Sequence, residues 1–145
     1  NNRPRGVLLA TNRRAIIENC FFSNCESAIA VSADNALWFE SGGVRDFTIR
    51  NNTFFDCCHM QGDHVIVIAK VGSLDNVYYH QNIKILNNLF LNRVKYTVFA
   101  DKVKGLYIKD NFVQNIDSPP DNAEEIQCLN CEEVEFNPSK KAASV

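Results

Sequence analysis

The stretch I-R-N-N-T-F, from Ile49 to Phe54, decides the fold because its pattern returns along the chain. In each copy an apolar residue is followed three positions later by Asn and five positions later by another apolar residue. The other copies are I-I-E-N-C-F (Ile16–Phe21), I-L-N-N-L-F (Ile85–Phe90), I-K-D-N-F-V (Ile108–Val113) and a weaker one, Val134 with Asn137. The copies begin at positions 16, 49, 85, 108 and 134, so they are separated by 33, 36, 23 and 26 residues. Unequal spacing indicates one repeated structural unit whose connections differ in length.

A second short apolar run precedes the repeated pattern in each unit. These runs are rich in β-branched residues and are bounded by Gly, Asn or Asp, which favours strands. No segment keeps an amphipathic helical period beyond about two turns. We therefore predict an all-β fold, a right-handed parallel β-helix of about four coils, in which equivalent strands pair roughly 4.8 Å apart. The runs are Ala28–Val31, Val65–Ile68, Thr97–Ala100 and Ile126–Leu129.

The repeated Asn and the aromatic residue after it have a structural interpretation. Asn tolerates left-handed backbone angles at a sharp corner, and stacked amides can satisfy polar groups inside the turn. The aromatic residues of successive copies should stack in the core. On this reading the Asn residues are Asn19, Asn52, Asn88 and Asn111, and the aromatic stack is Phe21, Phe54 and Phe90.

Length and charge limit the remaining possibilities. The 145-residue chain has no initiator Met and no capping helix before the first coil, so we expect coils over residues 1–137, missing upstream coils, and a disordered tail over 138–145. A net charge of -2 without a basic stripe argues against nucleic acid as a partner. No apolar run is long enough for a membrane span, and no signal peptide is visible.

Two cysteine patterns suggest sharper roles. Cys128 and Cys131 form a single C-x-x-C motif, but a zinc site would need a second pair, and a thioredoxin-like site would need a following helix. Cys25 and Cys58 each lie nine residues after a repeat start, so we expect them to stack on neighbouring coils. A disulfide between them requires export of the protein. No metal or cofactor is predicted.

The connections between the two strands of a unit differ most between coils. They run from Asp34 to Gly43 and from Val71 to Gln81 in two coils, but only from Asp101 to Lys104 and from Asn130 to Glu132 in the next two. Because equivalent positions stack, the two long connections should lie side by side on one face. Insertions gathered on one side of a solenoid usually build its binding surface.

The long connections combine aromatic, carboxylate and amide side chains, as sugar-binding clefts do. The first reads D-N-A-L-W-F-E-S-G-G and contains the only Trp; the second reads V-G-S-L-D-N-V-Y-Y-H-Q. A simpler alternative is that Trp38 and Phe39 only pack the loop onto the coils. The acids on this face are Asp34, Glu40, Asp75 and Asp101.

Several stretches together resemble the family 110 glycoside hydrolases. They are R-G-V-L-L-A-T from Arg5, S-A-I-A-V-S-A-D-N-A-L-W-F-E-S-G-G-V-R-D-F-T-I-R-N-N-T-F (Ser27–Phe54) and H-Q-N-I-K-I-L-N-N-L-F (His80–Phe90). The most specific element is W-F-E-S-G, preceded by Asp34. The resemblance implies a bacterial β-helix enzyme of carbohydrate metabolism, an exo-acting, inverting α-1,3-galactosidase that removes terminal galactose from glycans. It also implies a periplasmic or secreted location.

The resemblance implies roles for individual residues on the loop face. Asp34 and Glu40 match the family's pattern and are the predicted catalytic carboxylates. An inverting glycosidase holds its acid and base roughly 6.5–9.5 Å apart, although the missing upstream coils could supply one or both. We expect substrate contacts from Trp38, Asn35, Tyr78 and His80. A non-catalytic carbohydrate-binding or structural β-helix is the alternative; motifs of pectate lyases and polygalacturonases are absent.

Overall fold

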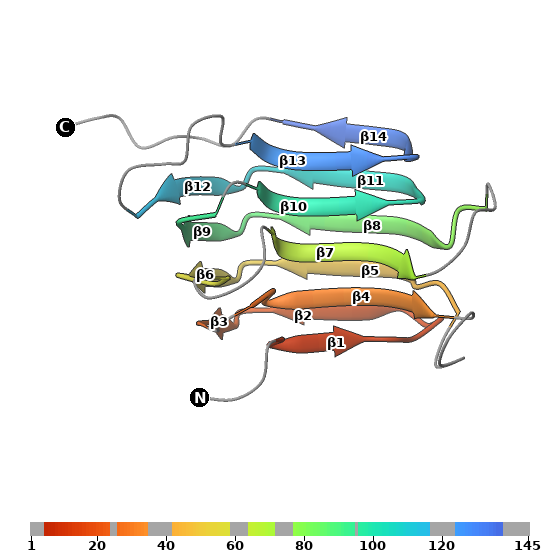
Figure 1. Cartoon of the computed structure of the whole chain (residues 1–145), viewed down its shortest axis with the longest axis horizontal. Helices are drawn as coiled ribbons and strands as arrows, with labels where there is room; N and C mark the ends of the chain where they lie inside the picture. Colours follow the sequence, from red (N-terminus) through yellow and green to blue (C-terminus); the bar gives the residue numbers. More distant parts are fainter. Residues whose placement is uncertain are drawn as a thin grey trace.

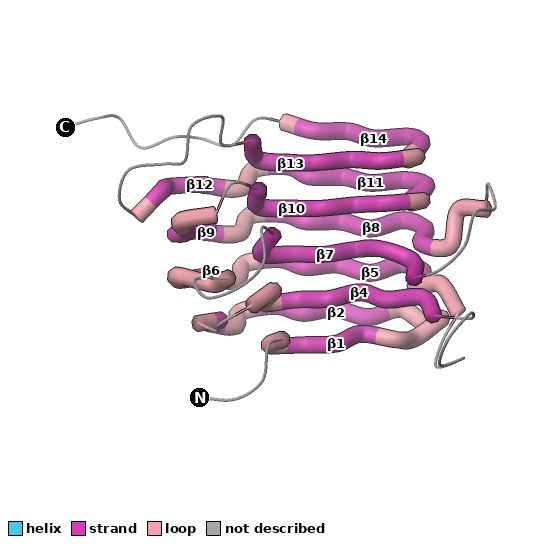
Figure 2. The backbone as a smooth tube through the Cα atoms, viewed as in Figure 1, coloured by secondary structure: helices cyan, strands magenta, loops and turns pink. Residues whose placement is uncertain are grey.

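The computed structural model describes residues 5–23, 26–34, 42–58, 64–71, 77–94, 96–116 and 124–137. Every strand pairing in this part of the chain is parallel, and three sheets result. Figure 2 shows strands and loops but no helix among the described residues. No helix of the described part is long and apolar enough to cross a membrane.

The sheets are named here by their strands. Sheet A has the order β1 (Val7–Leu9), β4 (Ile29–Asp34), β7 (His64–Val71), β10 (Tyr96–Asp101) and β13 (Glu124–Leu129). Sheet B has the order β14 (Glu132–Phe136), β11 (Val103–Lys109), β8 (His80–Leu86), β5 (Arg45–Arg50) and β2 (Ala15–Glu18). Sheet C has the order β12 (Phe112–Asn115), β9 (Leu89–Asn92), β6 (Thr53–Phe55) and β3 (Phe21–Phe22).

The chain visits sheets A, B and C in turn, so three consecutive strands make one coil (Figure 1). Four such coils and the first two strands of a fifth stack along one axis. Each of the four apolar runs expected before the repeated pattern overlaps a strand of sheet A. The prediction of a parallel β-helix is therefore confirmed.

The core lies between the sheets and is built from columns of equivalent residues. One column of sheet B contains Phe47, Ile83 and Leu106, which pair in register and are all fully buried. Val134 occupies the next position, opposite Leu106 rather than opposite Ile108 as the repeat predicted. The fifth copy of the pattern is therefore wrong by two residues, because Phe136 stands opposite Ile108.

A ladder of side-chain amides crosses the corner between sheets B and C. Oδ1 of Asn88 accepts hydrogen bonds from the backbone N–H and from Nδ2 of Asn52, at 3.0 and 3.1 Å. Asn111 receives the equivalent bonds from Asn88, both at 3.0 Å. All three residues are buried. The predicted structural role of these three Asn residues is confirmed.

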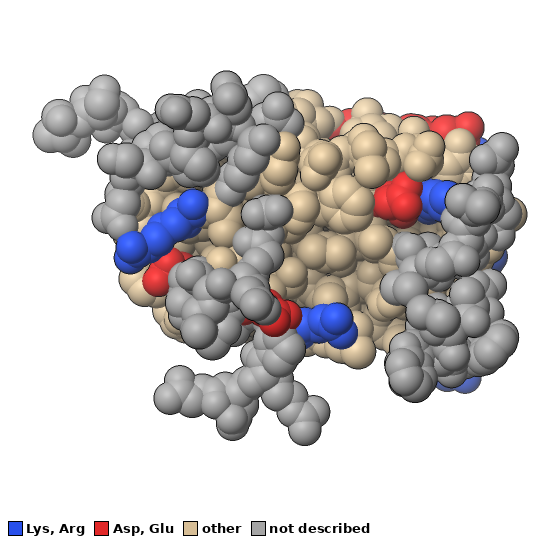
Figure 3. Space-filling view, viewed as in Figure 1, with Lys and Arg blue, Asp and Glu red and all other residues tan. Residues whose placement is uncertain are grey.

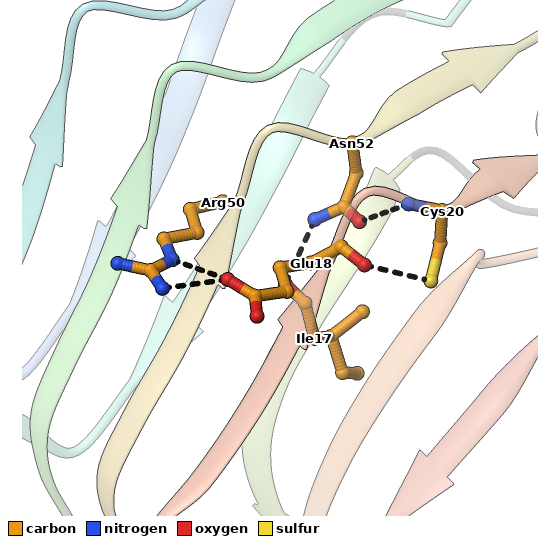
Figure 4. A network of polar contacts seen from close by, with 5 residues as sticks. All are labelled: Ile17, Glu18, Cys20, Arg50 and Asn52. Carbon is orange, nitrogen blue, oxygen red and sulfur yellow. Dashed lines mark hydrogen bonds and ion pairs between the residues drawn. The ribbon is translucent and has the colours of Figure 1, made fainter.

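The first coil departs from the prediction by one residue. Ile17, not Ile16, pairs with Ile49, so Cys20 takes the ladder position and donates its backbone N–H to Asn52 Oδ1 at 3.0 Å (Figure 4). Asn19 instead takes the left-handed corner position before the ladder, with φ 56°. Asn51, Asn87 and Asp110 stand at the equivalent positions of the next coils, with φ between 52° and 55°.

The same shift changes the aromatic stack. Phe22, Phe54 and Phe90 stack with centroid distances of 5.0 and 4.6 Å. Phe21 is 66% exposed and stacks on Phe55 outside the core, so the prediction for Phe21 is wrong. Doubled residues at both anchors of the first copy, Ile16–Ile17 and Phe21–Phe22, make the two registers look alike in the sequence.

Candidate functional site

The two long connections leave and re-enter the coils at matched positions. Asp34, at the end of β4, pairs with Val71, at the end of β7. Arg45, at the start of β5, pairs with Gln81, near the start of β8. Figure 1 shows these strand ends at one edge of the β-helix. The prediction that the two connections lie side by side is confirmed at their bases.

The later connections are short, as predicted. Lys102 alone joins β10 to β11, and two residues, Asn130 and Cys131, join β13 to β14. Asp101, one of the acids expected on this face, ends β10 and accepts a hydrogen bond from Asn130 Nδ2 at 3.0 Å.

The returning ends of the long connections touch each other at Gly43. A Cβ atom on Gly43 would lie 1.5 Å from the backbone oxygen of Tyr79, which no side chain can tolerate without movement. The neighbouring Gly42 has nothing within 4 Å of the same position. Gly43 is therefore required by close packing of the first connection on the second.

Most of the predicted site residues lie outside the described part of the chain. Asp34 ends β4, which places its backbone at the root of the first connection, but its side chain is outside the described set. Asn35, Trp38, Glu40 and Asp75 also lie outside it. Their roles stay predictions.

Tyr78 extends from the second connection towards the last coil. Its hydroxyl donates a hydrogen bond to the carboxylate of Glu132, which raises the pKa of Tyr78 and lowers that of Glu132. Lys104 lies in the intervening coil, with Nζ 3.4 Å from both Glu132 Oε2 and Glu133 Oε1. Tyr78 therefore has a hydrogen-bond partner two coils away, on Glu132. Its substrate contact stays a prediction.

His80 is the first residue of β8 rather than part of the loop, since the connection ends at Tyr79. The side chain is completely buried, and Nδ1 accepts a hydrogen bond from the backbone N–H of Val44 at 3.3 Å. Burial lowers the pKa of His80, and the nearby backbone carbonyl of Ala69 opposes this shift in part. The neutral imidazole therefore fixes the backbone at Val44, next to the end of the first connection. The predicted contact of His80 with substrate stays untested.

A polar cavity on the outer face of sheet B opens close to the same edge. Its volume is about 250 Å³, and it is lined by Arg14, Asp46, Thr48, Asn82 and Lys84. The sequence prediction missed this cavity because each residue, taken alone, looks like an ordinary polar residue on an exposed strand face.

The described cysteines differ in the pKa of their thiols. A hydrogen bond from the Cys128 thiol lowers the pKa of Cys131 to about 7, whereas burial raises the pKa of Cys58 to about 12. Cys25 lies outside the described residues, so the expected stacking with Cys58 is untested. The described residues contain no cluster of three or more His, Cys, Asp or Glu side chains suited to a metal ion.

Comparison with known proteins finds clear relatives, although no family model matches the chain. The chain is 37% identical over 134 residues to alpha-1,3-galactosidase A of Bacteroides thetaiotaomicron, which covers 90% of this chain. It is 37% identical over 115 residues to alpha-1,3-galactosidase B of the same species, covering 75% of the chain. Alpha-1,3-galactosidase A of Shewanella woodyi is 31% identical over 120 residues, covering 81%.

The aligned region is a minor part of each relative. It spans 23%, 19% and 20% of the three relatives' own lengths. The similarity nevertheless extends over 90% of the present chain. The resemblance noted in the sequence is thus confirmed, and the chain is a homologue of part of the α-1,3-galactosidases, the family 110 glycoside hydrolases.

Proposed function

We propose that this chain belongs to an exo-acting, inverting α-1,3-galactosidase, which removes terminal α-1,3-linked galactose from glycans. The observation that carries the proposal is the similarity to named alpha-1,3-galactosidases over 90% of the chain. The paired strand ends from which the two long connections leave and return support it, because loops gathered on one side of a solenoid are where binding residues usually lie. The proposed location is periplasmic or secreted.

In this proposal Asp34 and Glu40 supply the general acid and the general base. Inversion requires carboxyl groups roughly 6.5–9.5 Å apart, which leaves room for the attacking water. Both acids belong to the first connection, with Asp34 at its root and Glu40 six residues further along the chain. Trp38 would cover the apolar face of the sugar, and Asn35 and Tyr78 would bind its hydroxyls. His80 would act through the backbone that it supports at Val44.

The test is release of galactose from a Galα1-3Gal disaccharide by the protein that carries this chain. We expect Asp34→Asn and Glu40→Gln to lower kcat by roughly 10²–10⁴, the usual contribution of a general acid or base. Asp110→Asn is the matched control: this exposed carboxylate sits at a left-handed corner where three other coils have Asn, beyond the end of β11.

The outcomes separate the candidate functions. Full activity in both variants would remove Asp34 and Glu40 from the mechanism. No release by a folded wild-type protein that still binds the disaccharide would favour a non-catalytic carbohydrate-binding β-helix.

A further inference from the structure

The polar cavity on sheet B is formed by three adjacent coils. Arg14 lies just before β2, Asp46 and Thr48 lie on β5, and Asn82 and Lys84 lie on β8. Thr48 and Lys84 are direct partners in the sheet. Every residue that lines the cavity carries a polar or charged group, in contrast to the apolar interior beneath it.

A matched backbone feature shapes the cavity. Asp46 and Asn82 both adopt left-handed conformations, with φ of 54° and 53°, at equivalent places between paired residues. Asn82 Nδ2 donates a hydrogen bond to Asp46 Oδ1 at 2.5 Å. This bond joins the two strands at the cavity edge and engages one oxygen of the only carboxylate in the lining.

The cations of the cavity lack the carboxylate partners that three other cations on the strands of sheet B have. Arg50, Lys104 and Lys109 each pair with a carboxylate on the neighbouring coil. Arg14 and Lys84 form no such pair with any described residue. Lys84 has a cation–π contact instead, with Nζ 6.0 Å from the centroid of the Tyr107 ring. With Asp46 counted, the cavity keeps a formal charge of +1.

From this arrangement we propose that the cavity binds an acidic saccharide, one sugar ring that bears a sulfate or carboxylate group. Arg14 and Lys84 would pair with the oxyanion, because charge-assisted hydrogen bonds to such groups are strong and directional. Thr48, Asn82 and the remaining oxygen of Asp46 would bind ring hydroxyls. The volume of about 250 Å³ is below the range of drug-sized pockets, which suits a single sugar.

The position of the cavity connects it with the loop face. Asp46 and Asn82 come one or two residues after the strands β5 and β8 begin, where the long connections return to the coils. The cavity therefore adjoins the strand ends to which both long connections return, where the proposed function places the glycan. The choice of a saccharide as the ligand rests on the proposed function, whereas the preference for an anion rests on the lining alone.

The test is a binding titration, by calorimetry or by NMR, with galactose 6-sulfate, galacturonate, galactose and inorganic sulfate as probes. We expect at least one of the two charged sugars to bind more tightly than galactose or sulfate alone, and salt to weaken that binding. Arg14→Gln and Lys84→Gln should each lower the affinity roughly tenfold or more. Lys109→Gln, on the same sheet but paired with Glu135, is the control and should change nothing.

Three results would overturn the proposal. Wild-type affinity in both cavity variants, with unfolding midpoints unchanged, would show that the ligand binds elsewhere. Galactose binding as tightly as both charged sugars would refute the selection for charge, and sulfate binding as tightly as both would refute the recognition of the sugar. Because binding is measured without turnover, loss of galactosidase activity with intact binding would refute the proposed function alone.

Discussion

Replacing Asn88 by Ala should be among the most damaging single substitutions in the coils. The Asn88 amide takes part in four hydrogen bonds, two accepted at Oδ1 from Asn52 and two donated by Nδ2 to Ile49 O and Asn111 Oδ1. Asn88 is only 2% exposed, so water cannot replace these partners. The truncation therefore acts on both neighbouring coils at once.

The expected cost follows from which groups lose all their partners. The backbone N–H of Asn52 would lose its acceptor and stay buried, which costs about 1–3 kcal/mol. Asn52 Nδ2 keeps Ile17 O, and Asn111 Oδ1 keeps the Asn88 backbone N–H, so these groups lose one bond of about 1 kcal/mol each. We expect a total loss of about 3–5 kcal/mol, a large share of the usual 5–15 kcal/mol of a folded domain.

The measurement is equilibrium unfolding in urea, followed by far-UV circular dichroism, with the thermal midpoint as a second readout. Cys20→Ala is the matched control because Cys20 occupies the same ladder position but contributes only its backbone N–H to Asn52. That control should lie within about 0.5 kcal/mol of wild type. If Asn88→Ala loses no more stability than Cys20→Ala, the ladder does not stabilise the coils and the reasoning fails.

Three further predictions can be checked on the same chain. Phe54→Ala should cost about 3–5 kcal/mol in urea unfolding because Phe54 lies inside the aromatic stack, whereas Phe21→Ala should be almost neutral; equal costs would contradict the observed register. Gly43→Ala should lower the thermal midpoint clearly and Gly42→Ala should not, since only the former meets a backbone oxygen. Alkylation of Cys131 by iodoacetamide should rise with pH to half its maximal rate near pH 7, because the depressed pKa makes the thiolate dominant above that value; a midpoint near 9, read by mass spectrometry, would argue against the hydrogen bond from Cys128.

The repeated pattern predicts the fold well because its three central copies supply both an apolar anchor and a ladder position. Asn52, Asn88 and Asn111 all stand where the pattern places them. The fifth copy is displaced by two residues. The first copy has two adjacent apolar residues at each anchor, and the sequence cannot say which of the two faces inward. The partner strand decides, since Ile17 rather than Ile16 meets Ile49.

The candidate site is predictable only in part. Connection lengths correctly predict that the two long connections leave and return at neighbouring positions, because equivalent positions of a β-helix must stack. His80 is the first residue of β8, so whether it belongs to the loop or to the strand depends on where the strand begins. Hydrophobic patterning cannot locate that boundary to within one residue. The cavity on sheet B arises from Asp46 and Asn82 lying opposite each other in left-handed conformations, a juxtaposition that no local stretch of sequence reveals.

The strands β5 and β8 of sheet B begin where the long connections return and end at the asparagine ladder. Between these limits the number of residues is fixed: six positions separate Asp46 from Asn52, and six separate Asn82 from Asn88. Before Asp46 and Asn82 the chain can differ in length, because each connection leaves and returns without disturbing the pairing of the coils. A connection of different length is therefore compatible with the stacking of the coils, as long as the six-residue interval to the ladder is kept.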